Sequence, residues 1–376
     1  MSELKTTVQV RLCPTPEQAA ILRAHCQEYI STVNVLVAAL DGDVLPDGGK
    51  GTSTKDFTAA LPSAVKNQAL RDARSVWKRS RALGGIPLLR KPICQWNNQN
   101  WRMERTGEDE RLVLPVTQDG KVRQISVGCA CVALDGTPGL LRIKRKRGKW
   151  VAEVAYTLPE PEHTTGVASM GVDLGIKVPA VVHIMGKGHR FFGNGRQQRA
   201  KRRQFYAHRK DLQKAKKVRA VRKSQGKEAR WMRDTNHHLS HQIVSHAQQQ
   251  GVGIIRMEQL AGIRQRTARK SRGAKARKNN CMIATWTFHQ LATFIAYKAA
   301  RAGIAVAWVD PAHTSQQCPA CFRLNTADDR HYVCADCGWT GHRDAVGAIN
   351  ISRRTGLHGQ SAGATVASGS DGGRAA

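Results

Sequence analysis

The sequence has few acidic residues for its length. It carries 60 Lys and Arg residues against 28 Asp and Glu residues, which gives a net charge of +32 over 376 residues. A chain with this charge repels itself unless a polyanion offsets it. Nucleic acid is the expected partner, because each neutralised phosphate also releases counterions. Composition alone leaves a cationic membrane-surface protein and a ribosome-like RNA binder as alternatives.

The sequence also lacks a long apolar run. No stretch reaches the roughly 20 residues that span a membrane, and the N-terminal MSELKTTVQVRLCP has no apolar signal core. We therefore expect a cytoplasmic protein in a reducing compartment, with no membrane partner. No internal repeat is visible. Because 41% of the residues are hydrophobic, we expect two or three globular domains with real cores.

The order of elements in the first 165 residues predicts a β-barrel with a helical insertion. Residues 5–13 alternate like a strand, and Thr15 with Pro16 forms a helix cap with proline at the first helical position. Apolar residues then recur at helical spacing, and a second helix is predicted over 62–83. Short alternating runs between 86 and 158 read as antiparallel strands. The predicted domains are 1–13 (first barrel strand), 14–85 (helical domain) and 86–165 (remaining barrel).

From residue 166 the pattern predicts a ribonuclease-H-like α/β domain. Three strands are followed by a very basic helical run over 195–231, and then by helix, strand, helix and strand. In such a sheet the ends of the first and fourth strands meet near the final helix. The predicted limits are 166–310 for this domain, 311–341 for an inserted zinc finger, 342–357 for the final helix, and 358–376 for a disordered low-complexity tail.

Three carboxylates fall at informative places in this pattern. Asp173 in GVDLG and Glu258 in GIIRME each end an apolar strand, where a charge must be paired, hydrated or bound to metal. Asp344 begins the helix DAVGAINI, where the helix dipole favours its ionised form. Any one of them alone reads as a capping or solvated acid. Brought together, they would hold two Mg²⁺ ions about 4 Å apart for phosphodiester hydrolysis, with Mn²⁺ as an alternative cation.

Four of the ten cysteines have metal-ligand spacing. Cys318, Cys321, Cys334 and Cys337 follow the pattern C-x₂-C-x₁₂-C-x₂-C, which is typical of a tetrahedral, structural Zn²⁺ site. Two redox pairs are the alternative. The other six cysteines are scattered without such spacing and read as ordinary thiols.

These motifs resemble those of the TnpB family of transposon-encoded, RNA-guided nucleases, related to type V CRISPR effectors. The segments GVDLGI, IIRMEQL and TSQQCPACF…YVCADCGWTGHRDAVGAINI are similar to the three split RuvC motifs and the inserted finger of that family. The motif resemblance covers about 166–355 and extends more weakly to the N-terminus.

The resemblance implies a function and a set of partners. A guide RNA would bind the protein, one chain per RNA, and pair with double-stranded target DNA. The N-terminal half, as wedge barrel and recognition domain, would read a short motif beside the target. Asp173, Glu258 and Asp344 would form the RuvC catalytic site, and the four cysteines would bind zinc. A prokaryotic, nucleoid-associated protein is expected.

Two groups of basic residues are candidate nucleic-acid contacts, although a solvated charged face is the alternative for each. They are Lys144, Arg145, Lys146 and Arg147 in one run, and Arg199, Arg202, Arg203 and Arg209 in the basic helical run. Other functions also stay open: a miniature CRISPR effector, a nuclease-inactive guided repressor, and a junction resolvase or transposase that acts without RNA.

Two positions depart from the family pattern. Phe322 follows Cys321 where the family usually has glycine, which would reshape the knuckle turn. Val346 replaces the usual asparagine two residues after Asp344. We expect this second change to remove a polar group near the metals. Neither change removes a carboxylate, so an active nuclease is expected.

Overall fold

The computed structural model describes residues 4–45, 51–106, 109–130, 136–159, 161–162, 166–260, 287–326 and 330–355. The chain divides into two compact units, and the first ends at Pro159. The predicted tail over 358–376 lies outside the described residues. Within the described ranges, no helix combines the length and the apolar character that a membrane crossing requires.

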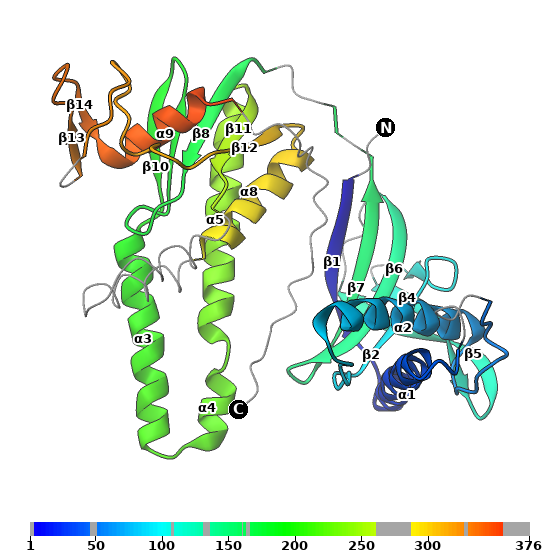
Figure 1. Ribbon diagram of the computed structural model, residues 1–376. Coiled ribbons are helices and arrows are strands. Elements are labelled where there is room, and N and C mark those ends of the chain that lie inside the picture. Colours follow the sequence, from blue (N-terminus) through cyan, green and yellow to red (C-terminus); the bar gives the residue numbers. More distant parts are fainter. Residues whose placement is uncertain are drawn as a thin grey trace. The chain divides into compact units, whose positions relative to one another are not determined.

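The first unit is built on a curled antiparallel sheet of seven strands (Figure 1). Trp96 at the end of one edge strand donates its indole N–H to the carbonyl of Pro115 in a strand near the other edge, at 3.0 Å, so the sheet bends back on itself. The sheet order is β2-β6-β7-β1-β5-β4-β3, with the strands β1 (Leu4–Cys13), β2 (Ile93–Trp96), β3 (Arg102–Thr106), β4 (Asp109–Gln118), β5 (Lys121–Ala130), β6 (Thr137–Lys146) and β7 (Lys149–Leu158).

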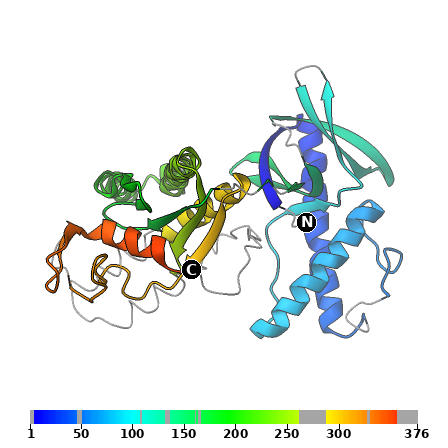
Figure 2. The same cartoon turned by 90° about the horizontal axis from the view of Figure 1, so that it is seen from above.

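Two helices lie between β1 and β2 in the sequence, as predicted. They are α1 (Pro16–Asp41) and α2 (Ser63–Leu83), and they pack against each other and against β2 (Figure 2). The predicted cap of α1 is confirmed: the Thr15 hydroxyl accepts from the Gln18 N–H at 3.2 Å, and the Gln18 side chain accepts from the Thr15 N–H at 3.1 Å. This reciprocal pair satisfies donors that the first helical turn leaves free.

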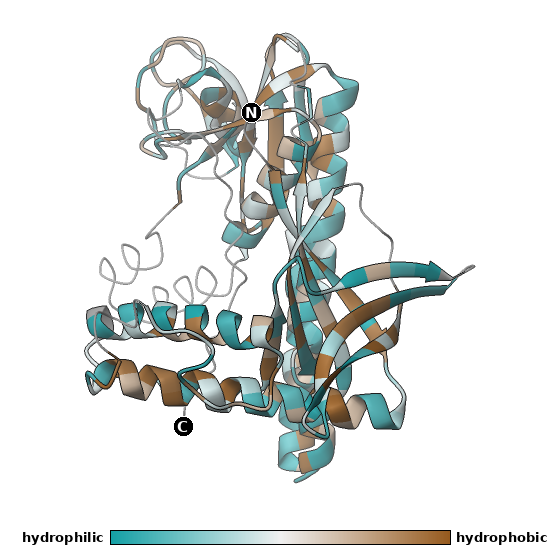
Figure 3. Cartoon of the chain, turned by 90° about the vertical axis from the view of Figure 1, so that its right-hand side faces the viewer, coloured by the Kyte–Doolittle hydropathy of each residue, from teal (hydrophilic) through white to brown (hydrophobic). Residues whose placement is uncertain are grey.

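Hydrophobic residues from the helices and the sheet form one core in this unit. Tyr29, Val65, Trp96 and Leu114 come from α1, α2, β2 and β4, and all four are fully buried. Hydrophobic and hydrophilic positions are interspersed along the helices (Figure 3), as expected for helices with one buried face. The helical insertion therefore shares its core with the sheet and is not a separate module.

The second unit contains a mixed sheet of five strands in the order β10-β9-β8-β11-β12. β9 is antiparallel to β8 and β10, whereas β11 is parallel to β8 and β12. The strands are β8 (Ala168–Asp173), β9 (Ala180–Ile184), β10 (Gly188–Phe192), β11 (Val252–Glu258) and β12 (Ala305–Val309).

The helices of this unit are α3 (Gly195–Lys214), α4 (Val218–Ser224), α5 (Lys227–Gln249), α8 (Phe288–Arg301) and α9 (Arg343–Arg353). The basic run predicted as helical forms α3, α4 and the start of α5, and α3 and α5 are the two arms of a long helical hairpin (Figure 1). Met170 and Ile255 from the sheet pack with Ile243 of α5 and Ile295 of α8 in a fully buried core. α9 contacts β8, β9 and β11, and a small hairpin of β13 (His331–Val333) and β14 (Thr340–His342) precedes it.

Candidate functional site

Asp173 and Glu258 end two neighbouring strands at the same level of the sheet. β8 and β11 run parallel, and their last recorded pair is Val172 opposite Met257, so Asp173 and Glu258 are the next residues on each strand. Neighbouring strands lie about 4.8 Å apart, and residues at one level point to the same face. The sheet thus brings together two carboxylates that lie far apart in the sequence.

The face that carries Asp173 is the one that α9 covers. Successive residues of a strand point to opposite faces, so Gly171 and Asp173 share a face. A Cβ atom on Gly171 would lie 2.2 Å from the Ala348 carbonyl oxygen of α9, and one on Gly347 would lie 2.7 Å from an Asp173 carboxylate oxygen. The two glycines therefore permit α9 to approach β8 closely enough for its backbone to lie against Asp173.

Asp344 lies in the first turn of α9. His342 caps this helix, and its Nδ1 accepts from the Asp344 N–H at 3.2 Å. One Asp344 carboxylate oxygen lies 3.6 Å from Nη2 of Arg330, a partner that is one-third exposed. The third predicted residue is therefore carried by the helix that also touches Asp173.

The charges of the three carboxylates interact. Burial raises the pKa of Asp173 well above its usual range, and the negative charges of Glu258 and Asp344 raise it further. The guanidinium of Arg343 acts in the opposite direction. Neighbouring carboxylates have this effect because like charges disfavour ionisation. Asp173 is thus the member of the group whose negative charge most needs a compensating cation.

Glu258 has a different environment. Burial raises its pKa, while a hydrogen bond from Thr314 and the positive charge of Arg354 lower it in part. The Thr314 hydroxyl donates to Glu258 Oε1 at 2.5 Å, a separation typical of a hydroxyl bonded to a carboxylate. This bond fixes one carboxylate oxygen of Glu258.

The three carboxylates fit a divalent cation in chemistry. Three carboxylates in one partly buried place repel each other, and hard oxygen donors suit Mg²⁺. The donor set is therefore suitable for such a cation. Among the described residues, the potential metal ligands whose atoms all lie within 4.8 Å of one another are the four cysteines.

The four cysteines do form a compact cluster. All their sulfur atoms lie within 4.8 Å of one another, with Cys318 and Cys337 at 3.6 Å and Cys321 and Cys334 at 3.5 Å. These separations exceed a disulfide bond of about 2.05 Å. A tetrahedron of sulfurs about 2.3 Å from zinc has edges of roughly 3.8 Å. The cluster therefore fits a four-thiolate zinc site and not two disulfides.

The two knuckles of the cluster differ at one turn position. Gly338 follows Cys337 with φ at +72°, and Phe322 follows Cys321 with φ at +64°. Both turns use the left-handed region, which glycine adopts freely and other residues adopt at a cost. The backbone of the first knuckle therefore keeps the glycine-like turn with phenylalanine in it.

Val346 lies on the finger side of α9. It is fully buried in a cluster with Cys318, Cys334 and Tyr332, and Cys321 packs against this cluster. Val346 thus supplies apolar contact to the cysteine knuckles. The expectation that Val346 removes a polar group near the metals stays a prediction.

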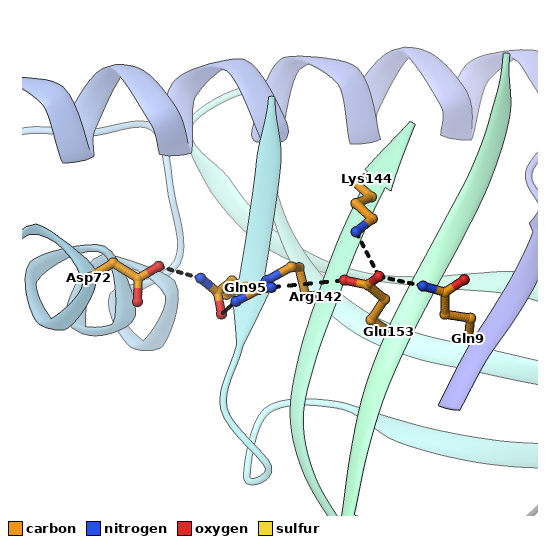
Figure 4. Close-up of polar contacts among 6 residues, drawn as sticks. All are labelled: Gln9, Asp72, Gln95, Arg142, Lys144 and Glu153. Carbon is orange, nitrogen blue, oxygen red and sulfur yellow. Dashed lines mark hydrogen bonds and ion pairs between the residues drawn. The ribbon is translucent and has the colours of Figure 1, made fainter. Parts of the chain in front are cut away.

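Lys144, one of the predicted nucleic-acid contacts, takes part in an ion pair within the first unit (Figure 4). Its Nζ lies 2.6 Å from Oε1 of Glu153, a side chain that is only 7% exposed. Gln9 donates to the same carboxylate at 2.8 Å, and Nη1 of Arg142 lies 3.9 Å from it. Lys144 therefore compensates a buried charge, whereas Arg145, Lys146 and Arg147 are exposed.

The same polar network extends to the helical insertion (Figure 4). Arg142 contacts the Gln95 side-chain oxygen at 3.4 Å, and Gln95 donates to Asp72 of α2. The Tyr29 hydroxyl of α1 also donates to Asp72, at 2.8 Å. These bonds join α1 and α2 to the sheet through buried polar groups.

The four predicted arginines of the basic run all lie on α3. Arg203 is exposed, whereas Arg199, Arg202 and Arg209 are half-buried. Arg202 pairs with Glu228 of α5 at 2.8 Å, which links the two arms of the hairpin. Their contacts with phosphate stay a prediction.

Several residues around the carboxylates were missed by the sequence analysis. They are Thr314, Arg330, Gly347, Gly171 and Arg354, and each acts through a contact between distant segments. Close packing at Gly347 could have been predicted, because a glycine inside a helical pattern often marks such packing. The other contacts produce no periodic pattern in the sequence from which they could be predicted.

The sequence matches known proteins around this site. The family model described as "Cas12f1-like, TNB domain" matches residues 288–351, from α8 through α9. A "CRISPR-associated endodeoxyribonuclease Cas12f1" of Syntrophomonas palmitatica is 28% identical over 337 residues, which are 76% of this chain and 66% of that protein. A TnpB-like protein of Methanocaldococcus jannaschii is 33% identical over 136 residues, which are 36% of this chain and 47% of that protein.

The chain is therefore similar to Cas12f1 nucleases and to a TnpB-like protein. A second Cas12f1 relative, from Sulfoacidibacillus thermotolerans, is 26% identical over 225 residues, which are 55% of this chain and 50% of that protein. The matched regions span between about half and two thirds of these curated relatives.

Solved structures share the fold of this chain. The chain resembles the protein in a "Cas12f1-sgRNA-target DNA complex" with a TM-score of 0.67 at 14% identity, covering 93% of this chain and 99% of that one. It resembles a "mini-RNA-guided endonuclease CRISPR-Cas_phi3" with a TM-score of 0.55 at 11% identity, covering 93% and 92%. At these identities the likeness concerns the fold alone.

Proposed function

We propose that this protein is an RNA-guided DNA endonuclease of the TnpB type that cleaves double-stranded DNA. The supporting observation is the meeting of Asp173 and Glu258 at adjoining strand ends, on the face covered by the helix that carries Asp344. The names of the curated relatives, endodeoxyribonuclease Cas12f1 and TnpB-like protein, agree with this reading. The second unit would then be a ribonuclease-H-like RuvC nuclease domain.

Asp173, Glu258 and Asp344 would hold two Mg²⁺ ions, with Mn²⁺ as an alternative. Bound there, the ions supply an activated water and stabilise charge on the leaving oxygen of a phosphodiester. The chain's own part is to hold the three carboxylates. The hydroxyl of Thr314 fixes Glu258, the guanidinium of Arg330 lies beside Asp344, and the backbone of α9 lies against Asp173.

The cysteine cluster would hold one structural Zn²⁺. Burial raises the pKa of the Cys334 thiol, but hydrogen bonds from the backbone of Cys337 and Asp336 and from neighbouring cysteines together lower it to about 7. Zinc binds the thiolate form, so binding would release the remaining thiol protons of the cluster. The finger would support target nucleic acid beside the nuclease site.

The proposed partners are a guide RNA and target DNA, on the basis of the net charge of the chain and its similarity to the curated relatives. A guide RNA, bound by one protein chain, would offset the net charge of +32 and select the DNA target. The first unit would be the wedge barrel with its helical recognition insertion. The exposed residues Arg145, Lys146, Arg147 and Arg203 would contact phosphate, together with Arg199, Arg202 and Arg209. The protein would act in the cytoplasm, at the nucleoid.

The direct test is Asp173→Ala in the complex with its co-purified RNA. We expect loss of cleavage of a target plasmid by about a thousandfold or more, since the metal site supplies several kcal/mol of transition-state stabilisation. Guide and target binding should persist. Asp234→Ala, which removes an exposed aspartate of α5, is the matched control and should cut normally. Plasmid cleavage by Asp173→Ala at the wild-type rate would contradict the proposal.

A miniature CRISPR effector is a second candidate, because two of the relatives are Cas12f1 nucleases. The chemistry of the site is the same in both. Sequencing the RNA that co-purifies with the protein separates them: a transposon-end transcript supports the TnpB type, and a spacer from a CRISPR array supports the effector.

A further inference from the structure

One segment between β12 and the cysteine finger is fixed to α9 at several points. Asn350 is buried in α9, and its side-chain amide donates to the carbonyl of Thr314 at 2.8 Å and to that of Gln317 at 2.7 Å. Arg354, just beyond the helix, donates to the carbonyls of Asp310 and Ala312. The backbone on both sides of Thr314 is thus fixed by α9.

This attachment orients the Thr314 hydroxyl. Thr314 is 4% exposed, and its hydroxyl lies 2.5 Å from Glu258 Oε1 and 3.2 Å from the Pro311 carbonyl oxygen. A hydroxyl has one hydrogen to donate, and a carboxylate is a stronger acceptor than a carbonyl. The bond to Glu258 is also the shorter of the two, so the hydrogen goes to the carboxylate.

α9 therefore positions each of the three carboxylates through a different contact. It carries Asp344 in its first turn, lies against Asp173 at Gly347, and fixes Glu258 through Asn350 and Thr314. The site is otherwise built from strand ends, which leave a long glutamate side chain free to rotate about several bonds. α9 can hold the three carboxylates in fixed relative positions only if the side chain of Glu258 is also fixed.

We propose that Thr314 is a positioning residue for Glu258, and that α9, through Asn350 and Arg354, holds Thr314 in place. In this role Thr314 would act through Glu258, by orienting a cation ligand. The inference deepens the proposed nuclease function and rests on the carboxylates being cation ligands. Loss of a hydrogen-bond partner behind a metal ligand typically weakens metal binding by about 10- to 100-fold.

The test measures cation binding without nuclease activity. Fe²⁺ bound at a Mg²⁺ site, with ascorbate and hydrogen peroxide, generates hydroxyl radicals that cut the nearby polypeptide. In the protein–RNA complex without DNA, we expect cuts near Asp173, Glu258 and Asp344. The Fe²⁺ concentration for half-maximal cutting should rise about 10- to 100-fold in Thr314→Val, which keeps the shape and loses the hydroxyl. Thr314→Ser, which keeps the hydroxyl, should stay within about threefold of wild type.

The possible outcomes distinguish failure of the proposed nuclease site from failure of the positioning role of Thr314. No localised cutting in the wild-type protein would overturn the proposed nuclease site itself. Localised cutting with the same half-maximal concentration in Thr314→Val and wild type would overturn the positioning role alone. Equal impairment in Thr314→Ser and Thr314→Val would also overturn it, because the variant that keeps the hydroxyl would then bind the cation no better than the variant that loses it.

A second variant covers the case in which Thr314→Val fails to fold. Arg354→Lys keeps the positive charge near Glu258 but loses the planar fork that reaches two carbonyls. We expect a rise of a few fold in the half-maximal Fe²⁺ concentration, with thermal unfolding unchanged. An unchanged half-maximal concentration would show that Arg354 does not hold the Thr314 segment in place, and would contradict that part of the proposal.

Discussion

The four cysteines come from one short segment, whereas the three carboxylates come from two strands and a helix that are distant in sequence. The cysteine sulfurs already lie at distances suited to one tetrahedral ion. The carboxylates are neighbours, and the charges of Glu258 and Asp344 raise the pKa of Asp173. Soft ligands on a local turn can be arranged by backbone geometry alone. Hard anionic ligands from distant segments depend on the packing of the whole domain, and a bound cation offsets their repulsion.

The largest effect is expected at the cysteine cluster. Cys318→Ser removes a buried ligand, and structural zinc contributes on the order of 10 kcal/mol to small zinc domains. Metal analysis should show about one zinc per chain in wild type and almost none in the variant. Cys13→Ser, an exposed cysteine without ligand spacing, is the control and should retain its zinc. Full zinc content in Cys318→Ser would show that the cluster is not a four-ligand site.

At the carboxylates we expect a substitution to raise stability instead of lowering it. The folded-state pKa of Asp173 is raised above its unfolded value, so ionisation costs stability as pH rises above about 4. Asp173→Asn should therefore stabilise the Mg²⁺-free protein at pH 7 by about 2 kcal/mol, and the gain should vanish toward pH 4. Thermal unfolding at several pH values measures this. Asp234→Asn is the exposed control, and destabilisation by Asp173→Asn at pH 7 would contradict the electrostatic account.

The basic run on the β6–β7 hairpin provides a third contrast. Lys144→Ala leaves the buried Glu153 without its closest cation and should lower the free energy of unfolding by about 1 to 2 kcal/mol. Arg145→Ala should leave stability unchanged. It should weaken RNA binding and lower the salt dependence of the affinity by about one counterion. Denaturant unfolding measures the stability of both variants, and RNA titrations at several salt concentrations measure their RNA affinity. If both variants changed stability and RNA affinity equally, Lys144 and Arg145 would not have the separate roles inferred here.

The smallest effect is expected at the knuckle turns. Phe322→Gly removes a left-handed phenylalanine at φ +64° and should stabilise the finger by about 1 kcal/mol. Gly338→Ala places a side chain at φ +72° in open space, so the change meets no steric clash. The left-handed backbone should then destabilise the finger by about 1 kcal/mol. The rate of zinc release to a chelator reports both. Faster release from Phe322→Gly would show that its ring contributes more than its turn costs.

Local patterns made much of this molecule predictable. The spacing of the cysteines indicated a compact cluster, and the strand ends indicated where Asp173 and Glu258 would lie. Thr15 and Pro16 predicted the start of α1 correctly. These predictions worked because the signals are short-range: the spacing of a knuckle, the period of a strand and a cap.

What could not be predicted depends on contacts between distant segments. Lys144 looks like its neighbours in a basic run, and only the pairing of β6 with β7 brings it to Glu153. The contact of Val346 with Cys318 and Cys334 depends on how α9 packs against the cysteine segment, which the sequence does not show. The bond from Thr314 to Glu258 requires three elements to be in place at once.

The most direct measurement is anomalous diffraction from crystals of the guide-RNA complex soaked in Mn²⁺. The account predicts two peaks about 4 Å apart, each within bonding distance of carboxylate oxygens from Asp173, Glu258 and Asp344. It would be contradicted by an absence of manganese at this place, or by a carboxylate of the three that points away from the ions.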